Sequence, residues 1–201
     1  MRAIELFDID IDDLIPPDDG AGRTTGCHVS AIIRLIMQGL EPDKYGDGSP
    51  TNWVRITIGF AFERMLELGL RALAGTFFRP SELMQDGIYA SPDAIRVEGG
   101  LLAVEEYKAT WKKSIASGLS SDAIVRELDK RFRLWLWQIK AYCYLVGTCT
   151  AVLRVFFVNG NYTFTNEGGP KLRCFRLEFE QQELDDCWAM LLREAKAGNL
   201  L

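Results

Sequence analysis

The run LLAVEEYKAT, residues 101–110, constrains the fold of this chain more than any other stretch. It opens with apolar residues typical of a buried β-strand and then reaches Glu105, Glu106 and Lys108. Strands more commonly end in turn residues such as Gly, Pro, Asn or Asp. An apolar strand that leads into two carboxylates and a lysine predicts that the strand ends where a buried sheet opens into a cleft.

The carboxylates of this run differ in the face that they occupy. Side chains alternate along a strand, so Glu106 and Lys108 share one face and Glu105 lies on the other. Upstream, residues 94–97 have the pattern of a second strand, joined to the first by a Glu-Gly-Gly turn. Asp93, at the entry of that strand, is therefore expected to approach Glu106 across an antiparallel pairing.

This set of groups has a defined chemistry. Two converging carboxylates repel and raise each other's pKa unless a cation lies between them. Mg²⁺ or Mn²⁺ would resolve the conflict, with Asp93, Glu106 and the backbone carbonyl of Tyr107 as the protein ligands. Lys108 would then orient or deprotonate the attacking water, or stabilise charge on a phosphate. The set predicts hydrolysis of phosphodiester bonds.

The rest of the chain changes between helical and strand periodicity. Helices are expected over residues 27–40, 51–75, 122–147 and 181–198, and further strands over 88–89, 151–158, 162–164 and 172–179. This order predicts an α/β fold, a three-layer sandwich whose central mixed β-sheet is flanked by helices.

Length and charge divide the chain into two parts. We expect residues 25–201 to form one domain, preceded by an acidic, partly flexible arm over residues 1–24. The net charge of −5 argues against a uniform coat for nucleic acid, but residues 107–140 carry eight Lys and Arg against three Asp and Glu. The basic stretch directly follows the Glu-Tyr-Lys sequence.

Other residue types exclude several classes of site. The five cysteines form no C-x-x-C pair and are expected to be reduced thiols, and the single histidine, His28, excludes multi-histidine metal sites. No apolar run approaches the roughly 18 residues of a membrane span, so no membrane association is expected. The first residues do not have the pattern of a secretory signal, which predicts a cytoplasmic location.

Pro92-Asp93 and Glu106-Tyr107-Lys108 resemble the signature of the PD-(D/E)XK nuclease superfamily. The tripeptide alone is weak, since E-x-K occurs by chance on the order of once in a chain of this size. A second copy at residues 194–196 falls in an expected helix. Adjacent strands, the turn between them and the apolar run distinguish the copy at Glu106.

Two more features resemble the RecB-like branch of this superfamily, which includes lambda-exonuclease-like nucleases. Gln138 and Tyr142 match its Q-x-x-x-Y helix, and Glu63 stands on a helix before the PD strand. The resemblance implies a restriction-endonuclease-like core, with Glu63 completing the metal shell of Asp93 and Glu106. The cysteines are too scattered for the iron–sulfur cluster of some members, so none is expected.

Contacts to DNA are expected around the same region. The residues predicted to make them are Gln138, Tyr142, Thr110, Lys112, Lys113, Lys130 and Arg131. Such contacts would address phosphates rather than base sequence. An ordinary solvated helix face is the alternative interpretation of the lysines and arginines.

The chain is therefore predicted to be a metal-dependent deoxyribonuclease resembling small stand-alone nucleases of phages. An exonuclease or end-processing enzyme of recombination or repair is favoured, because no extra domain for reading base sequence is evident. The same resemblance suggests either assembly into a homo-oligomer or binding to a recombination partner protein. The alternative is a catalytically silent nucleic-acid-binding or assembly protein on the same fold. A small phosphorylated substrate would require a glycine-rich phosphate loop, which the sequence lacks.

Overall fold

The computed structural model describes residues 24–46, 53–74, 77–159 and 171–201. The helices are α2 (Val29–Leu40), α3 (Pro42–Tyr45), α4 (Trp53–Ala74), α5 (Ser121–Val146) and α6 (Gln181–Ala197). The strands are β1 (Cys27–His28), β2 (Phe77–Phe78), β3 (Leu83–Gln85), β4 (Ile88–Ala90), β5 (Ala94–Glu98), β6 (Leu101–Thr110), β7 (Thr150–Phe157) and β8 (Lys171–Glu178). Apart from Thr24, the expected acidic arm lies outside the described residues, as does the strand expected over 162–164.

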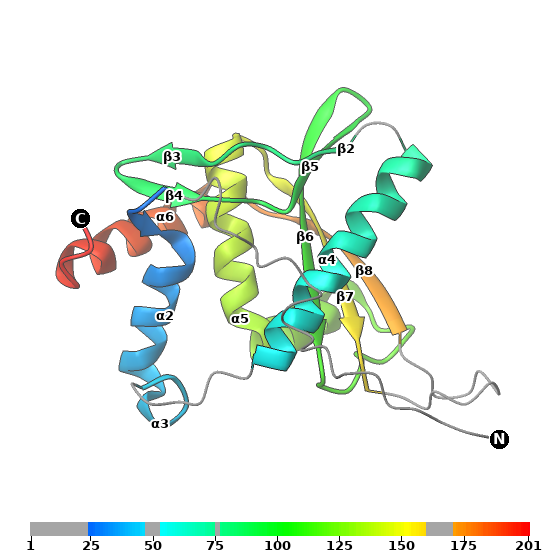
Figure 1. Cartoon of the computed structure of the whole chain (residues 1–201), viewed down its shortest axis with the longest axis horizontal. Helices are drawn as coiled ribbons and strands as arrows, with labels where there is room; N and C mark the ends of the chain where they lie inside the picture. The colour runs from blue at the N-terminus through cyan, green and yellow to red at the C-terminus, as the bar shows by residue number, and fades with distance from the viewer. Residues whose placement is uncertain (1–23, 47–52, 75–76, 160–170) are drawn as a thin grey trace, which may run out of the picture.

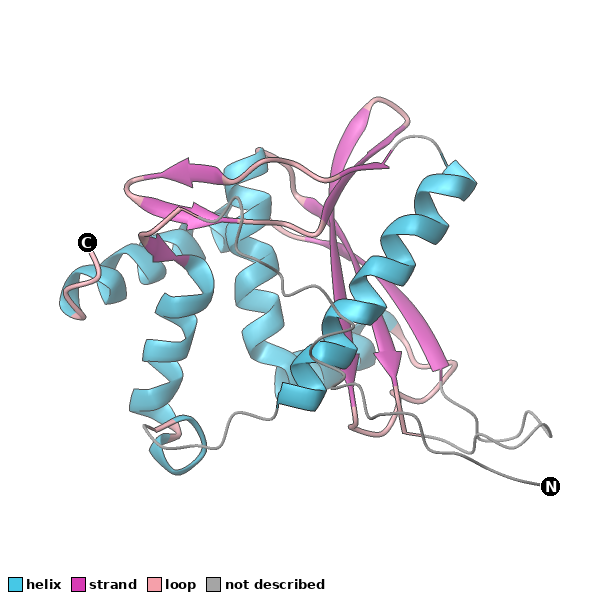
Figure 2. Cartoon of the chain, in the orientation of Figure 1, coloured by secondary structure: helices cyan, strands magenta, loops and turns pink. Residues whose placement is uncertain are grey.

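A five-stranded mixed sheet forms the centre of the molecule, with strand order β2-β5-β6-β7-β8. The pairing of β6 with β7 is parallel, and the other pairings in this sheet are antiparallel. The central strand, β6, is therefore hydrogen-bonded on both sides. Figure 2 shows these strands in magenta with the helices around them.

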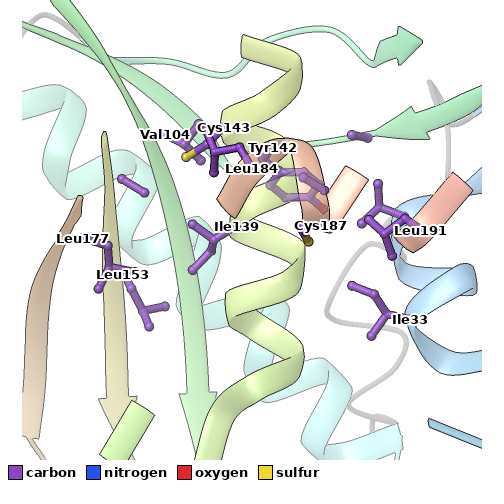
Figure 3. Packing of buried hydrophobic residues seen from close by; sticks show 14 of the residues in the cluster. Ile33, Val104, Ile139, Tyr142, Cys143, Leu153, Leu177, Leu184, Cys187 and Leu191 are labelled. Carbon is purple, nitrogen blue, oxygen red and sulfur yellow. The ribbon is translucent and has the colours of Figure 1, made fainter. Parts of the chain in front are cut away.

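Helices cover both faces of this sheet, which confirms the predicted three-layer α/β sandwich. On one face Tyr107 of β6 packs with Phe62 and Leu66 of α4. On the other face Val104 of β6 belongs to the main core with Ile139 of α5 (Figure 3). Helices α2 and α6 pack beside α5 and away from α4 (Figure 1).

A second, three-stranded sheet has the order β1-β4-β3. Asp86 and Gly87 join β3 to β4 with φ angles of 52° and 79°, the geometry of a tight type I′ hairpin turn. The carboxylate of Asp86 also accepts a hydrogen bond of 2.9 Å from the indole N–H of Trp188 on α6. Cys27 and His28, expected at the start of a helix, instead pair with β4.

The long helix α5 has clear ends and an unexpected break. The Ser120 hydroxyl caps its first turn by accepting the N–H of Ala123, and Gly147 ends it in the left-handed conformation with φ 73°. Phe132 departs from helical geometry, with φ −137° and ψ 28°. No proline or glycine marks this position, so helical periodicity predicted a continuous helix.

One expectation about β6 is wrong. The strand does not end at its charged residues but continues through Lys108, which pairs with Val155, to Thr110, which pairs with Phe157. The parallel ladder with β7 supplies backbone partners along this stretch, and one sequence does not reveal that pairing. The charged residues therefore lie within a central strand. No helix in the described part of the chain is long and apolar enough to cross a membrane.

Candidate active site

The Asp93 carboxylate lies against the middle of the Glu-Tyr-Lys sequence. Ala94 pairs with Glu105 across the β5–β6 hairpin, so Asp93, one residue earlier, lies beside the next residues of β6. Its Oδ2 atom accepts a hydrogen bond of 2.6 Å from the backbone N–H of Tyr107. The structure thus brings the aspartate to the neighbourhood of Glu106, as the hairpin pattern predicted.

Glu106 and Lys108 point to the same side of β6 and interact directly. The ammonium of Lys108 donates a hydrogen bond to Oε1 of Glu106. Glu106 is 1% exposed, and the side chain of Lys108 is 19% exposed. The second carboxylate oxygen, Oε2 of Glu106, is buried without a hydrogen-bond partner among the described residues. A buried carboxylate oxygen without a partner is costly unless a cation satisfies it.

Electrostatics couple the three groups. Burial, followed by the charge of Asp93, raises the pKa of Glu106 to about 8, although Lys108 acts in the opposite direction. Burial lowers the pKa of Lys108, but the charges of Glu106 and Asp93 outweigh it, and the net shift is upward. Lys108 therefore keeps its proton at neutral pH, while Glu106 holds a proton more readily than an exposed carboxyl.

The Q-x-x-x-Y residues of α5 face the same cluster. The side-chain amide of Gln138 donates a hydrogen bond of 2.7 Å to the hydroxyl of Tyr142. Tyr142 is 3% exposed. Burial and the charge of Glu106 raise its pKa, and Lys108 acts in the opposite direction. The i,i+4 spacing on α5 therefore links Gln138 to a tyrosine within electrostatic range of the β6 groups.

Glu63 lies on α4, and its charge contributes to the raised pKa of Glu106. It is partly exposed, whereas Tyr107 directs its ring into the apolar cluster under α4 and its N–H to Asp93. In residues 24–46, 53–74, 77–159 and 171–201, no group of three or more His, Cys, Asp or Glu side chains is arranged to hold a metal ion. The two carboxylates of Asp93 and Glu106 are the side chains of this site that could bind a metal ion.

The other residues predicted to contact DNA lie apart from Gln138 and Tyr142, where the loop after β6 meets the first half of α5. Thr110 is largely buried, and its hydroxyl accepts the N–H of Lys112 at 3.2 Å. The Lys112 ammonium donates to the carbonyl of Arg131 at 2.6 Å, and the Arg131 guanidinium donates to the carbonyl of Lys113. Lys130 lies exposed on the same part of α5.

Sequence reasoning missed the partners of Glu105. This carboxylate is fully buried on the α4 face, where Arg154 of β7 donates to both of its oxygens at 2.7 and 3.1 Å. Arg96 of β5 lies 3.3 Å from the same carboxylate. Alternation along β5 and β6 places Arg96 and Glu105 on one face, but Arg154 joins them only through the β6–β7 pairing. Glu105 is therefore held by a buried ion network.

Comparisons with known proteins show a likeness of fold. No protein-family model and no curated protein matches the sequence. The crystal structure of SSO0001 is 14% identical over 92% of this chain and 81% of its own, with a TM-score of 0.51. An alkaline exonuclease from Laribacter hongkongensis is 14% identical over 89% and 91% of the two chains, with a TM-score of 0.49.

A phage-related exonuclease from Haemophilus somnus 129PT is 13% identical over 90% of this chain and 84% of its own, with a TM-score of 0.46. These identities are low, and the likenesses concern the fold alone. The likeness to SSO0001, with its TM-score above 0.5, supports a shared fold, and membership of the PD-(D/E)XK superfamily and its lambda-exonuclease-like branch stays a prediction.

Proposed function

We propose that this protein is a deoxyribonuclease dependent on Mg²⁺ or Mn²⁺ that hydrolyses phosphodiester bonds. The observation that carries the proposal is the unequal hydrogen bonding of the two carboxyl oxygens of Glu106. One of its oxygens is bonded to Lys108, and the other is buried without a partner among the described residues. Asp93, whose charge raises the pKa of Glu106, is the second carboxylate at the same place. A divalent cation would relieve both the unsatisfied oxygen and the repulsion.

Asp93 and Glu106 would hold the ion, with Glu63 and the carbonyl of Tyr107 as further proposed ligands. Two carboxylates suffice for Mg²⁺, which usually keeps several waters and takes further oxygens from substrate phosphates. When bound, such an ion polarises the phosphate and lowers the pKa of a coordinated water.

Lys108 would stabilise negative charge on the phosphate. The sequence left two roles open for this lysine, orientation or deprotonation of water and charge stabilisation. Its pKa is raised by Glu106 and Asp93, so the amine remains protonated and is a poor base at neutral pH. The bond to Glu106 also fixes the position of the ammonium, as preorganised charge stabilisation requires.

Tyr142, Gln138 and the basic residues would position the DNA. Tyr142 and Gln138 form a hydrogen-bonded pair next to the proposed catalytic groups. Thr110, Lys112, Lys113, Lys130 and Arg131 would contact phosphates without regard to base sequence.

Residues 25–201 would form the nuclease domain, and an exonuclease or end-processing role in recombination or repair is the favoured form of the activity. A cytoplasmic location and a phage-type origin belong to the same proposal, as does assembly into a homo-oligomer or with a recombination protein.

A second candidate is a nucleic-acid-binding protein without turnover. The observation in its favour is that the ammonium of Lys108 already contacts one carboxyl oxygen of Glu106, while the described residues contain no group of three metal-binding side chains. In that case the ion pair would be structural. Substitutions of Asp93 or Lys108 would then leave the function of the protein intact.

The discriminating experiment incubates linear and circular DNA with the protein and Mg²⁺ or Mn²⁺. We expect wild type to degrade linear DNA only, and Lys108→Ala and Asp93→Ala to lower the rate at least about a hundredfold. The matched controls Lys196→Ala and Asp185→Asn, on α6, should retain full activity. Cutting of circles would identify an endonuclease. If wild type and all variants bind DNA and none of them cleaves it, the second candidate is supported.

A further inference from the structure

A cavity of about 490 Å³ lies beside the break in α5, where the first half of this helix meets α3 and the end of α2. Its lining includes the cations Lys44, Lys112 and Arg131 and the aromatic rings of Tyr45, Phe132 and Trp135. Glu41 and Asp129 also line it, but Glu41 pairs with Lys44 at 3.0 Å and Asp129 pairs with Arg133 at 3.2 Å. The cavity therefore combines positive charge with flat apolar surface.

Reciprocal hydrogen bonds fix the cations of this cavity. Lys112 donates to the carbonyl of Arg131, the residue before the break at Phe132, and Arg131 donates to the carbonyl of Lys113. The ammonium of Lys112 lies 4.9 Å and the guanidinium carbon of Arg131 5.0 Å from the centre of the Phe132 ring. Two positive groups are thereby held over one aromatic ring before any ligand binds, which lowers the cost of binding.

The charges of Lys44 and Arg131 act against the ammonium of Lys112, although Glu41 pairs with Lys44 at 3.0 Å and Glu127 with Arg131 at 3.7 Å. Burial lowers the pKa of Lys112, and the charges of Lys44 and Arg131 lower it further. Glu41 opposes this shift only as the smallest contribution. An anion placed among the three cations would remove the repulsion.

A second cavity, of about 620 Å³, continues the basic surface along α5. It shares Lys130 and Arg131 with the first cavity and adds Arg126 together with Glu127, the carboxylate that pairs with Arg131 at 3.7 Å. Two adjoining cavities with shared cations fit a nucleic-acid strand better than a single phosphate ion, because a strand carries a phosphate at every nucleotide.

We propose that the first cavity binds one nucleotide unit of a single-stranded DNA, away from the bond that is cleaved. Its phosphate would lie among Lys44, Lys112 and Arg131, and its base would stack on the exposed part of Tyr45 or Trp135. The choice of DNA as the ligand rests on the proposed nuclease function. Lys112 follows Lys108 by four positions, so the Cα atoms of the two lysines are at most about 14 Å apart along the backbone. A strand of a few nucleotides would span both.

Binding of a fluorescently labelled 12-residue oligothymidylate, measured by anisotropy in EDTA, tests this site. Lys44→Glu combined with Lys130→Glu should weaken binding at least about tenfold and reduce the slope of log Kd against log salt by about 0.7 for each cation lost. Tyr45→Ala should weaken binding about fivefold or more. The controls Arg193→Glu and Lys196→Glu, which reverse charges on α6, should bind within about twofold of wild type.

Three results separate the possible outcomes. Equal binding by the cavity variants and the α6 controls would overturn the site. Displacement of the oligonucleotide by dTMP at equal nucleotide concentration would overturn the assignment to a strand and indicate a free nucleotide. Weakened binding by the cavity variants in a protein that cleaves no DNA would support this site while the nuclease proposal fails.

Discussion

The carboxylate of Asp93 accepts a hydrogen bond of 2.6 Å from the backbone N–H of Tyr107, the residue between Glu106 and Lys108. This contact ties the entry of β5 to the charged part of β6. It also requires only an acceptor oxygen, which an asparagine can supply, whereas metal binding and the coupling to Glu106 require the negative charge. The structural and proposed catalytic roles of Asp93 are therefore separable.

Asp93→Asn should keep the fold and lose the activity. The amide oxygen can still accept the Tyr107 N–H, so we expect a change in unfolding free energy below about 1 kcal/mol. Asp93→Ala should cost about 1–2 kcal/mol, because the buried N–H then loses its partner. DNA hydrolysis should fall at least about a hundredfold in both variants. Urea unfolding and a nuclease assay check the two effects, and an active Asp93→Asn variant would contradict the catalytic role.

Tyr142→Phe should reduce hydrolysis about tenfold or more, because it removes the hydroxyl that Gln138 holds near Glu106 and Lys108. The loss of one partly buried hydrogen bond should cost about 1 kcal/mol of stability. Tyr144→Phe is the matched control on the same helix. The hydroxyl of Tyr144 accepts a hydrogen bond from Gln85 at 3.3 Å, and we expect activity within about twofold of wild type. Similar rates for the two variants would argue against a role for Tyr142.

Arg154→Met should destabilise the protein by about 3 kcal/mol, measured by urea or thermal unfolding. It removes both hydrogen bonds to the buried carboxylate of Glu105 and leaves only Arg96 as its charged partner on neighbouring strands. Arg176→Met, on the adjacent strand β8, removes a pair with Glu178 that is largely solvated and should cost less than about 1 kcal/mol. Equal costs would show that the Glu105 network contributes little.

Stability should depend on pH through Glu106. In the unfolded chain this carboxyl releases its proton near its ordinary pKa of 4.5, whereas in the fold it holds the proton up to about 8. The native state thus binds more protons between these values, so its stability falls as pH rises from 4.5 to 8. Relative to Glu106→Gln in EDTA, wild type should lose at most about 1.4 kcal/mol per pH unit in this window. Denaturant titrations at pH 5 to 9 measure the difference, and a constant difference would contradict the shift.

Local patterns in the sequence were sufficient to predict most helices and strands and the arrangement of Asp93, Glu106 and Lys108. Alternation placed Glu106 and Lys108 on one face and Glu105 on the other, and the glycine turn placed Asp93 beside them. The i,i+4 spacing linked Gln138 to Tyr142 on α5. These are contacts between residues close along the chain, or joined by a tight turn, and short-range geometry determines them.

Only the tertiary structure decided the contacts that cross between distant elements. The parallel pairing with β7 carries β6 past Lys108 to Thr110 and brings Arg154 to Glu105. Packing against the loop after β6 accompanies the break at Phe132 that shapes the basic cavity. One sequence by itself determines periodicity and turn geometry, because both depend on neighbouring residues. Which strand pairs with which, and where a helix bends, depends on long-range packing that no local pattern records.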